Sequence, residues 1–158
     1  MTLRYAAAAA IASTLLLNSV SPRSVRAQGK AATAKSLRCE FSLSTVATWN
    51  GAGTAEAALK PSKLVLRFDS INADEGTAEL KNGTVGTGIT VQLAAQNLHF
   101  IQSFRSGPLY VTTVFGLETP GGKLKAVHSR HEYFKTPLDG STSSPEQYYG
   151  ECEILDPR

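Results

Sequence analysis

The sequence predicts an all-β fold: a single antiparallel barrel of eight or nine strands, or alternatively a two-layer β-sandwich, after a cleavable signal peptide. Three observations predict it. From Leu37 onward, apolar and polar residues alternate with a period of two, which is typical of strands with one buried face. Turn-forming residues separate these runs. The only two cysteines, Cys39 and Cys152, lie near the two ends of this region.

Residues 1–27 have the pattern of a signal peptide. A short basic start, Met1 to Arg4, precedes an apolar or small-residue run from Tyr5 to Leu17, and Val25-Arg26-Ala27 has the small-x-small form of a cleavage site. The apolar run is shorter than the roughly 20 residues that a membrane-spanning helix needs. We therefore expect cleavage after Ala27 and export to the periplasm or the cell exterior, with a retained anchor as the alternative.

Removal of this leader changes the charge of the chain. The whole sequence has 16 basic and 13 acidic residues. The leader contains three of the basic residues and no acidic one, so the mature chain is close to neutral. It also lacks the lysine and arginine cluster with which proteins contact a phosphate backbone. These features exclude nucleic acid as an expected partner.

Residues 28–36 are small and polar with nothing to bury, so they predict a flexible lead-in to a domain over residues 37–156. The first strand begins at Leu37, and Leu37, Cys39, Phe41 and Leu43 share its apolar face. Further strands are expected over residues 64–69, 77–81, 89–93, 98–104, 109–115, 123–134 and 147–155.

Turn residues connect these strands. Asn50-Gly51 and Asn82-Gly83 are strong two-residue hairpin signals, and TPGG at 119–122 suits a type II turn with a positive φ at its first glycine. The segment TAEAALK at 54–60 has a helical composition, but it is short and ends at a proline. We assign it to a strand that pairs back across Asn50-Gly51. The polar residues 136–147 predict the longest irregular loop.

The two cysteines are expected to form a disulfide, because an exported chain matures in an oxidising compartment. The bridge closes a loop of about 110 residues, which in the chain-entropy model stabilises the fold by about 4 to 5 kcal/mol. It would join the first strand to the last. A lipoprotein role for Cys39 is the alternative, but Arg38 stands where a small residue is required.

The stretch AVHSRHEYF contains two of the three histidines. Side chains of a strand alternate between its two faces, so the odd spacing separates His128 from His131. A metal site shared by both is therefore not expected. His128, Arg130 and Glu132 share one face, whereas His131 and Tyr133 share the other.

The first face is expected to be a solvated charged ladder, with His131 and Tyr133 then lining the interior. If instead the first face lies inside, it forms a polar site in which Arg130 is suited to a carboxylate or phosphate. The candidate ligand-binding residues are thus Arg130, His131, Tyr133 and His128.

The sequence contains no strong signal for catalysis. The chain has no GxSxG nucleophile elbow, and the glycine-rich GTVGTG at 83–88 runs into a strand instead of a helix. The strand number is similar to that of small exported barrels such as lipocalins. Their Gly-x-Trp start is missing here, because Trp49 stands in ATWNG, and likeness of fold alone does not indicate function.

The expected function is therefore that of an exported, non-catalytic protein that binds a small apolar or amphipathic molecule in its interior, without a cofactor. An alternative is a structural or interaction module with a packed core and another exported protein as its partner. A third hypothesis is a small barrel enzyme that uses His128 or His131 as acid or base.

Overall fold

The computed structural model describes residues 29–49, 53–81, 88–136 and 140–155, with the backbone alone for residues 133–136 and 140–143. The expected signal peptide and the Asn50-Gly51 and Asn82-Gly83 turns lie outside the described residues.

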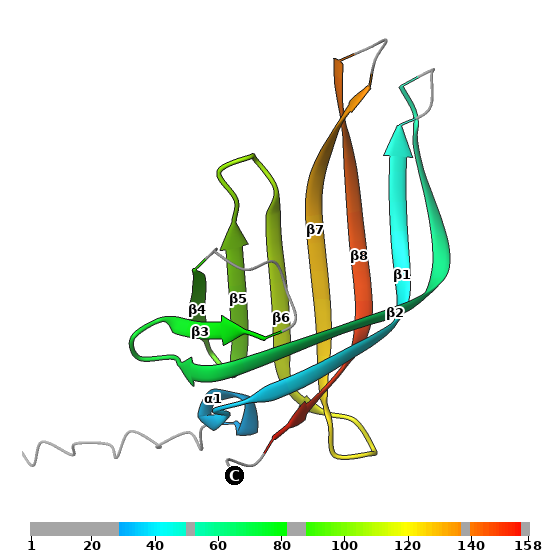
Figure 1. Cartoon of the computed structure of the whole chain (residues 1–158). Helices are drawn as coiled ribbons and strands as arrows, with labels where there is room; N and C mark the ends of the chain where they lie inside the picture. The colour runs from blue at the N-terminus through cyan, green and yellow to red at the C-terminus, as the bar shows by residue number, and fades with distance from the viewer. Residues whose placement is uncertain (1–28, 50–52, 82–87, 137–139, 156–158) are drawn as a thin grey trace, which may run out of the picture.

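Eight antiparallel strands close into a ring, as Figure 1 shows, which confirms the all-β barrel. Each strand pairs with its neighbours in the sequence, and the last strand pairs with the first. The strands are β1 (Leu37–Trp49), β2 (Ala55–Asn72), β3 (Thr77–Leu80), β4 (Ile89–Ala94), β5 (Asn97–Ser103), β6 (Leu109–Glu118), β7 (Leu124–Thr136) and β8 (Gly140–Ile154).

Two strands differ in extent from the prediction. The segment TAEAALK does belong to a strand, since β2 pairs back onto β1 from Ala55 opposite Trp49. The predicted irregular loop over residues 136–147 was wrong, because β8 begins at Gly140 and pairs with β7 from Gly140 to Cys152. Backbone hydrogen bonds between paired strands do not require apolar side chains, so the polar sequence did not reveal this part of the hairpin.

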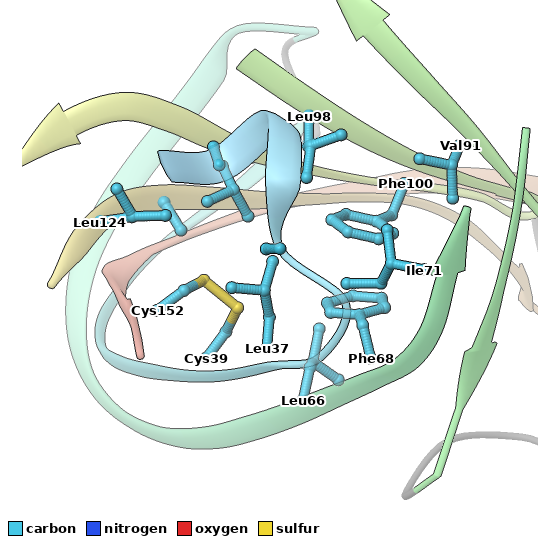
Figure 2. Packing of buried hydrophobic residues seen from close by; sticks show 14 of the residues in the cluster. Leu37, Cys39, Leu66, Phe68, Ile71, Val91, Leu98, Phe100, Leu124 and Cys152 are labelled. Atoms are coloured by element: carbon cyan, nitrogen blue, oxygen red, sulfur yellow. A yellow bond between two sulfur atoms is a disulfide. The ribbon is translucent and has the colours of Figure 1, made fainter. Parts of the chain in front are cut away.

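The apolar core fills the end of the barrel nearest α1 (Lys30–Thr33), the one helix among the described residues. Phe68 of β2 stacks on Phe100 of β5 with ring centroids 4.0 Å apart, and Leu37 and Leu98 are fully buried near them (Figure 2). Each such side chain contributes about 1.5 to 3 kcal/mol when it is removed from water. Alternate residues of the strands thus meet inside, as the period of two predicts.

The segment before β1 is packed against this core, so the expectation that it has nothing to bury was wrong. Ala31 and Ala34 are almost completely buried. The Ile71 amide donates to the carbonyl of Lys35 at 3.0 Å, and the Leu155 amide donates to that of Ser36 at 3.0 Å. The alanine side chains are small enough for the single helical turn to approach the barrel closely. Among the described residues, no helix is both long enough and apolar enough to span a membrane.

A β-bulge in β1 corrects the predicted phase of that strand. Phe41 lies opposite Gly150 of β8 and Leu43 lies opposite Tyr149, so Ser42 is an inserted residue. The insertion turns the next side chains over. Leu43, expected inside with Phe41, is 40% exposed on the outer face, whereas Ser44 is buried.

The TPGG turn also differs from the prediction. The Gly122 amide donates to the Thr119 carbonyl at 2.9 Å, which closes a four-residue turn. The positive φ of 76° belongs to Gly122, not to Gly121. A type II turn requires it at Gly121, so the expected turn type was wrong.

The disulfide is confirmed. Cys39 and Cys152 face each other across β1 and β8, with Sγ atoms 1.97 Å apart and Cα atoms 3.9 Å apart. Both are fully buried (Figure 2). The bond therefore joins the first and last strands at the seam where the ring closes.

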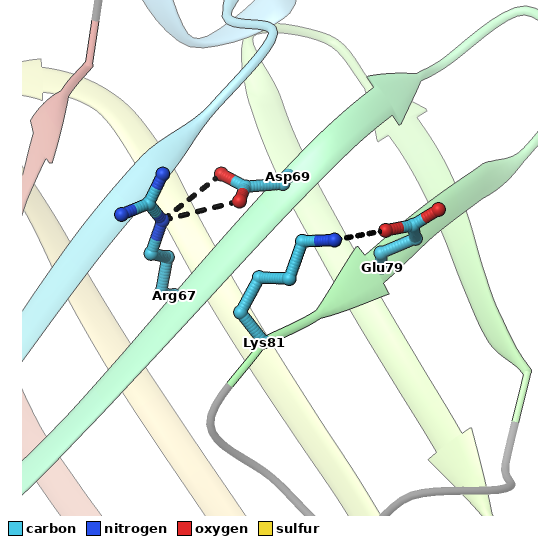
Figure 3. Close-up of polar contacts among 4 residues, drawn as sticks. All are labelled: Arg67, Asp69, Glu79 and Lys81. Carbon is cyan, nitrogen blue, oxygen red and sulfur yellow. Dashed lines mark hydrogen bonds and ion pairs between the residues drawn. The ribbon is translucent and has the colours of Figure 1, made fainter.

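The outer face of β2 and β3 is charged. Arg67 pairs with Asp69 through nitrogen and oxygen atoms 3.1 Å apart, and Lys81 pairs with Glu79 at 2.6 Å (Figure 3). Such exposed pairs contribute little to stability.

Candidate functional site

The inward face of β7 changes from apolar to polar along the strand. Leu124 and Ala126 belong to the core, His128 is 2% exposed, and Arg130 and Glu132 are half-buried. The prediction that these last three form a solvated outer ladder was wrong. Their phase follows from the burial of Leu124 and Ala126, which lie four and two residues before His128 on the same face.

The other two predicted residues do not join this group. His131 is exposed on the outer face of the barrel, opposite the face on which it was expected. Tyr133 lies in β7, but its side chain is outside the described part of the chain. The structure therefore brings together His128 and Arg130 and separates His131 from them.

His128 is held through both ring nitrogens. Its Nδ1 lies 2.8 Å from the hydroxyl of Thr112 on β6, and Arg130 Nε donates to its Nε2 at 3.2 Å. Because an arginine only donates, Nε2 accepts and Nδ1 carries the ring proton. Burial first, and the charge of Arg130 second, lower the pKa of His128 to about 4. The ring is therefore neutral at pH 7.

Arg130 lies between two aromatic rings. Its guanidinium carbon is 5.2 Å from the ring centroid of Tyr110 on β6 and 5.2 Å from that of Tyr148 on β8. Both contacts are cation–π interactions. Together with the hydrogen bond to His128, they favour this position of the side chain.

Two glutamates lie beside this arginine, and each accepts a hydrogen bond from one of the two tyrosines. Tyr110 donates to Glu132, and Tyr148 donates to Glu146 at 2.5 Å. Burial, followed by these hydrogen bonds, raises the pKa of Tyr110 and of Tyr148 to about 12. Among the described residues, no carboxylate oxygen lies within 4.0 Å of a guanidinium nitrogen of Arg130.

We call the group of polar residues around this arginine the Arg130 cluster. They face inward from three neighbouring strands, on the side of the core away from α1. The cluster consists of Tyr110, Thr112, His128, Arg130, Glu132, Glu146 and Tyr148. The sequence paired three of them by parity, but Thr112, the two tyrosines and Glu146 were missed, because only the strand register places them beside His128 and Arg130.

A second feature, an apolar groove, lies on the outer wall over β1, β6, β7 and β8. Its volume is about 540 Å³, within the range of small-molecule pockets. The apolar residues that line it include Leu43, Phe115, Leu117, Val127 and Tyr149. Leu117 is 64% exposed. The β1 bulge contributes to the groove by placing Leu43 on this face.

Among the described residues, no group of three His, Cys, Asp or Glu side chains is placed to hold a metal ion.

Comparisons with protein-family models, curated proteins and solved structures gave no significant match to this chain. Its function is therefore inferred from the chemistry of the site.

Acidification is expected to destabilise the barrel through His128. In the unfolded chain this ring takes up a proton near pH 6.5, whereas in the fold it does so only near pH 4. The unfolded state therefore binds more protons between these values, and stability that is complete above pH 6.5 is lost as the pH falls toward 4. Between pH 7 and pH 5 the loss is about 2 kcal/mol.

Urea unfolding of the native protein and of His128→Gln at pH 7, 6 and 5 measures this effect. The native protein should lose about 2 kcal/mol more than the variant over this range. The same loss in both proteins would show that the buried ring is not responsible.

Proposed function

We propose that this chain is an exported, non-catalytic β-barrel protein that binds a small molecule through an anionic group of the ligand, at the Arg130 cluster. One observation carries the proposal: the guanidinium of Arg130 lies between two tyrosine rings and donates to His128, and no described carboxylate lies within 4.0 Å of it. The buried disulfide, which favours an oxidising compartment, supports export.

The polar side chains of the Arg130 cluster limit the chemical class of the expected ligand. Apolar side chains fill the half of the interior near α1, whereas the Arg130 cluster presents charges and hydroxyl groups. A purely apolar molecule would cover the charged groups of Arg130, Glu132 and Glu146 without supplying hydrogen-bond partners, at a cost of about 1 to 3 kcal/mol each. A carboxylate or phosphate is instead matched by the two terminal nitrogens of the guanidinium fork.

An acid or base role for His128 is not favoured. Both of its ring nitrogens are already engaged, one by Thr112 and one by Arg130. A pKa of about 4 also leaves the ring with little proton affinity near neutrality. Binding without chemistry therefore accounts best for this arrangement.

Titration of the disulfide-bonded protein with butanoate and hexanoate tests the proposal, with hexanol as a ligand that lacks the anionic group. Binding is followed through the NMR signal of the Arg130 Nε–H and through the thermal midpoint, which a ligand of the native state raises. We expect saturable shifts with the carboxylates, and binding at least about tenfold weaker in Arg130→Gln and in Arg130→Lys.

The matched control is Arg38→Gln, which removes an arginine that pairs with Glu40 on the outer face of β1. This variant should bind the carboxylates as the native protein does. Equal binding by Arg130→Gln would place the ligand elsewhere, for example in the apolar groove. Failure of every anion to bind would contradict the proposal and favour the interaction-module hypothesis.

A further inference from the structure

The charges of the Arg130 cluster are not balanced. Arg130 contributes one positive charge, Glu132 and Glu146 contribute two negative charges, and His128 is neutral at pH 7. The protonated tyrosines add none. The half-buried cluster therefore has a net charge of −1 before any ligand arrives.

The two glutamates are neighbours of the arginine, one along its own strand and one across the sheet. Glu132 follows Arg130 by two residues on the inward face of β7, and Glu146 is its direct cross-strand neighbour on β8. A ligand that reaches the guanidinium thus comes close to both. A purely anionic ligand would bring the net charge of this half-buried cluster to −2, which is unfavourable because like charges repel.

From this charge pattern we infer that the ligand is zwitterionic, with a cationic group such as an ammonium beside its anionic group. The inference rests on the proposed function and specifies the class of ligand for the same site. The anionic group binds Arg130, and the cationic group binds Glu132, Glu146 or both.

The glutamates retain the capacity for such a contact. A carboxylate has about four acceptor positions, and one tyrosine hydroxyl occupies a single position on each glutamate. These hydrogen bonds also hold the carboxylates in place, so a ligand ammonium meets acceptors that are already oriented. A ligand with a cationic group alone would be repelled by Arg130, whereas a zwitterion satisfies both kinds of charge.

The test compares ω-amino carboxylates with alkyl carboxylates of the same chain length: β-alanine with propanoate, 4-aminobutanoate with butanoate, and 6-aminohexanoate with hexanoate. Calorimetry and the Arg130 Nε–H signal are recorded on the disulfide-bonded protein at constant ionic strength, because salt screens such contacts. The amino carboxylate of the best length is expected to bind about tenfold more tightly than its partner.

Variants assign this preference to the glutamates. In Glu132→Gln or Glu146→Gln the preference should fall by about three- to tenfold, and the plain carboxylate should bind more tightly because one negative charge is removed. Glu40→Gln on the outer face of β1 is the matched control and should leave the preference unchanged. Circular dichroism checks that each variant is folded, and the plain carboxylate serves as an internal measure of site integrity.

The outcomes separate the two proposals. If the plain carboxylates bind through Arg130 as tightly as the amino carboxylates, the zwitterion inference is wrong and the anion-binding function stands. If the preference survives in both glutamine variants, the inference is also wrong. If neither series binds, or if both bind independently of Arg130, the proposed function fails together with it.

Discussion

Reduction of the Cys39–Cys152 disulfide is expected to lower the free energy of unfolding by about 4 to 5 kcal/mol. The bond joins residues 113 positions apart, so its loss frees almost the whole domain in the unfolded state. It also joins β1 to β8, the two strands that complete the ring. Urea unfolding with and without a reductant, monitored by circular dichroism, measures the change.

The disulfide is fully buried, so the reductant must be added to the unfolded protein before refolding is attempted. The double variant Cys39→Ala, Cys152→Ala provides the control, since its unfolding midpoint should not respond to the reductant. An unchanged midpoint for the native chain after verified reduction would mean that strand pairing alone holds the seam.

Substitution Gly150→Ala is expected to destabilise the barrel by about 3 kcal/mol or more. A Cβ atom on Gly150 would lie 1.9 Å from the carbonyl oxygen of Glu40 and 2.7 Å from the Cα of Phe41. Both are backbone atoms of β1, so no side-chain rotation relieves the contact. The variant must move β1 away from β8 at the bulge, next to the disulfide.

Gly88→Ala is the matched control, because its Cβ would meet nothing within 4 Å and its backbone is not left-handed. Its effect on the free energy of unfolding should stay within about 0.5 kcal/mol. Thermal and urea unfolding of both variants measure the difference. Equal stability of the two would show that β1 and β8 separate at this point without cost.

From the sequence, the residues of the candidate site on β7 could be grouped by face, but either face could have been the buried one. Parity placed His128, Arg130 and Glu132 on one face of β7 and His131 on the other, and the structure agrees. Parity does not say which face is inside, because Val127 and His131 offered a mixed pattern on the opposite side. The burial of Leu124 and Ala126 decides this, and burial depends on the neighbouring strands.

The amino-acid sequence by itself determined the period of two, the antiparallel strand order and the pairing of the only two cysteines, because these follow from local alternation, turn residues and covalent chemistry. Only the tertiary structure decided where the alternation slips at Ser42 and which charges meet Arg130. A one-residue bulge reverses every later side chain of a strand. Cross-strand neighbours such as Tyr110 and Glu146 are set by register, which depends on how eight strands close together.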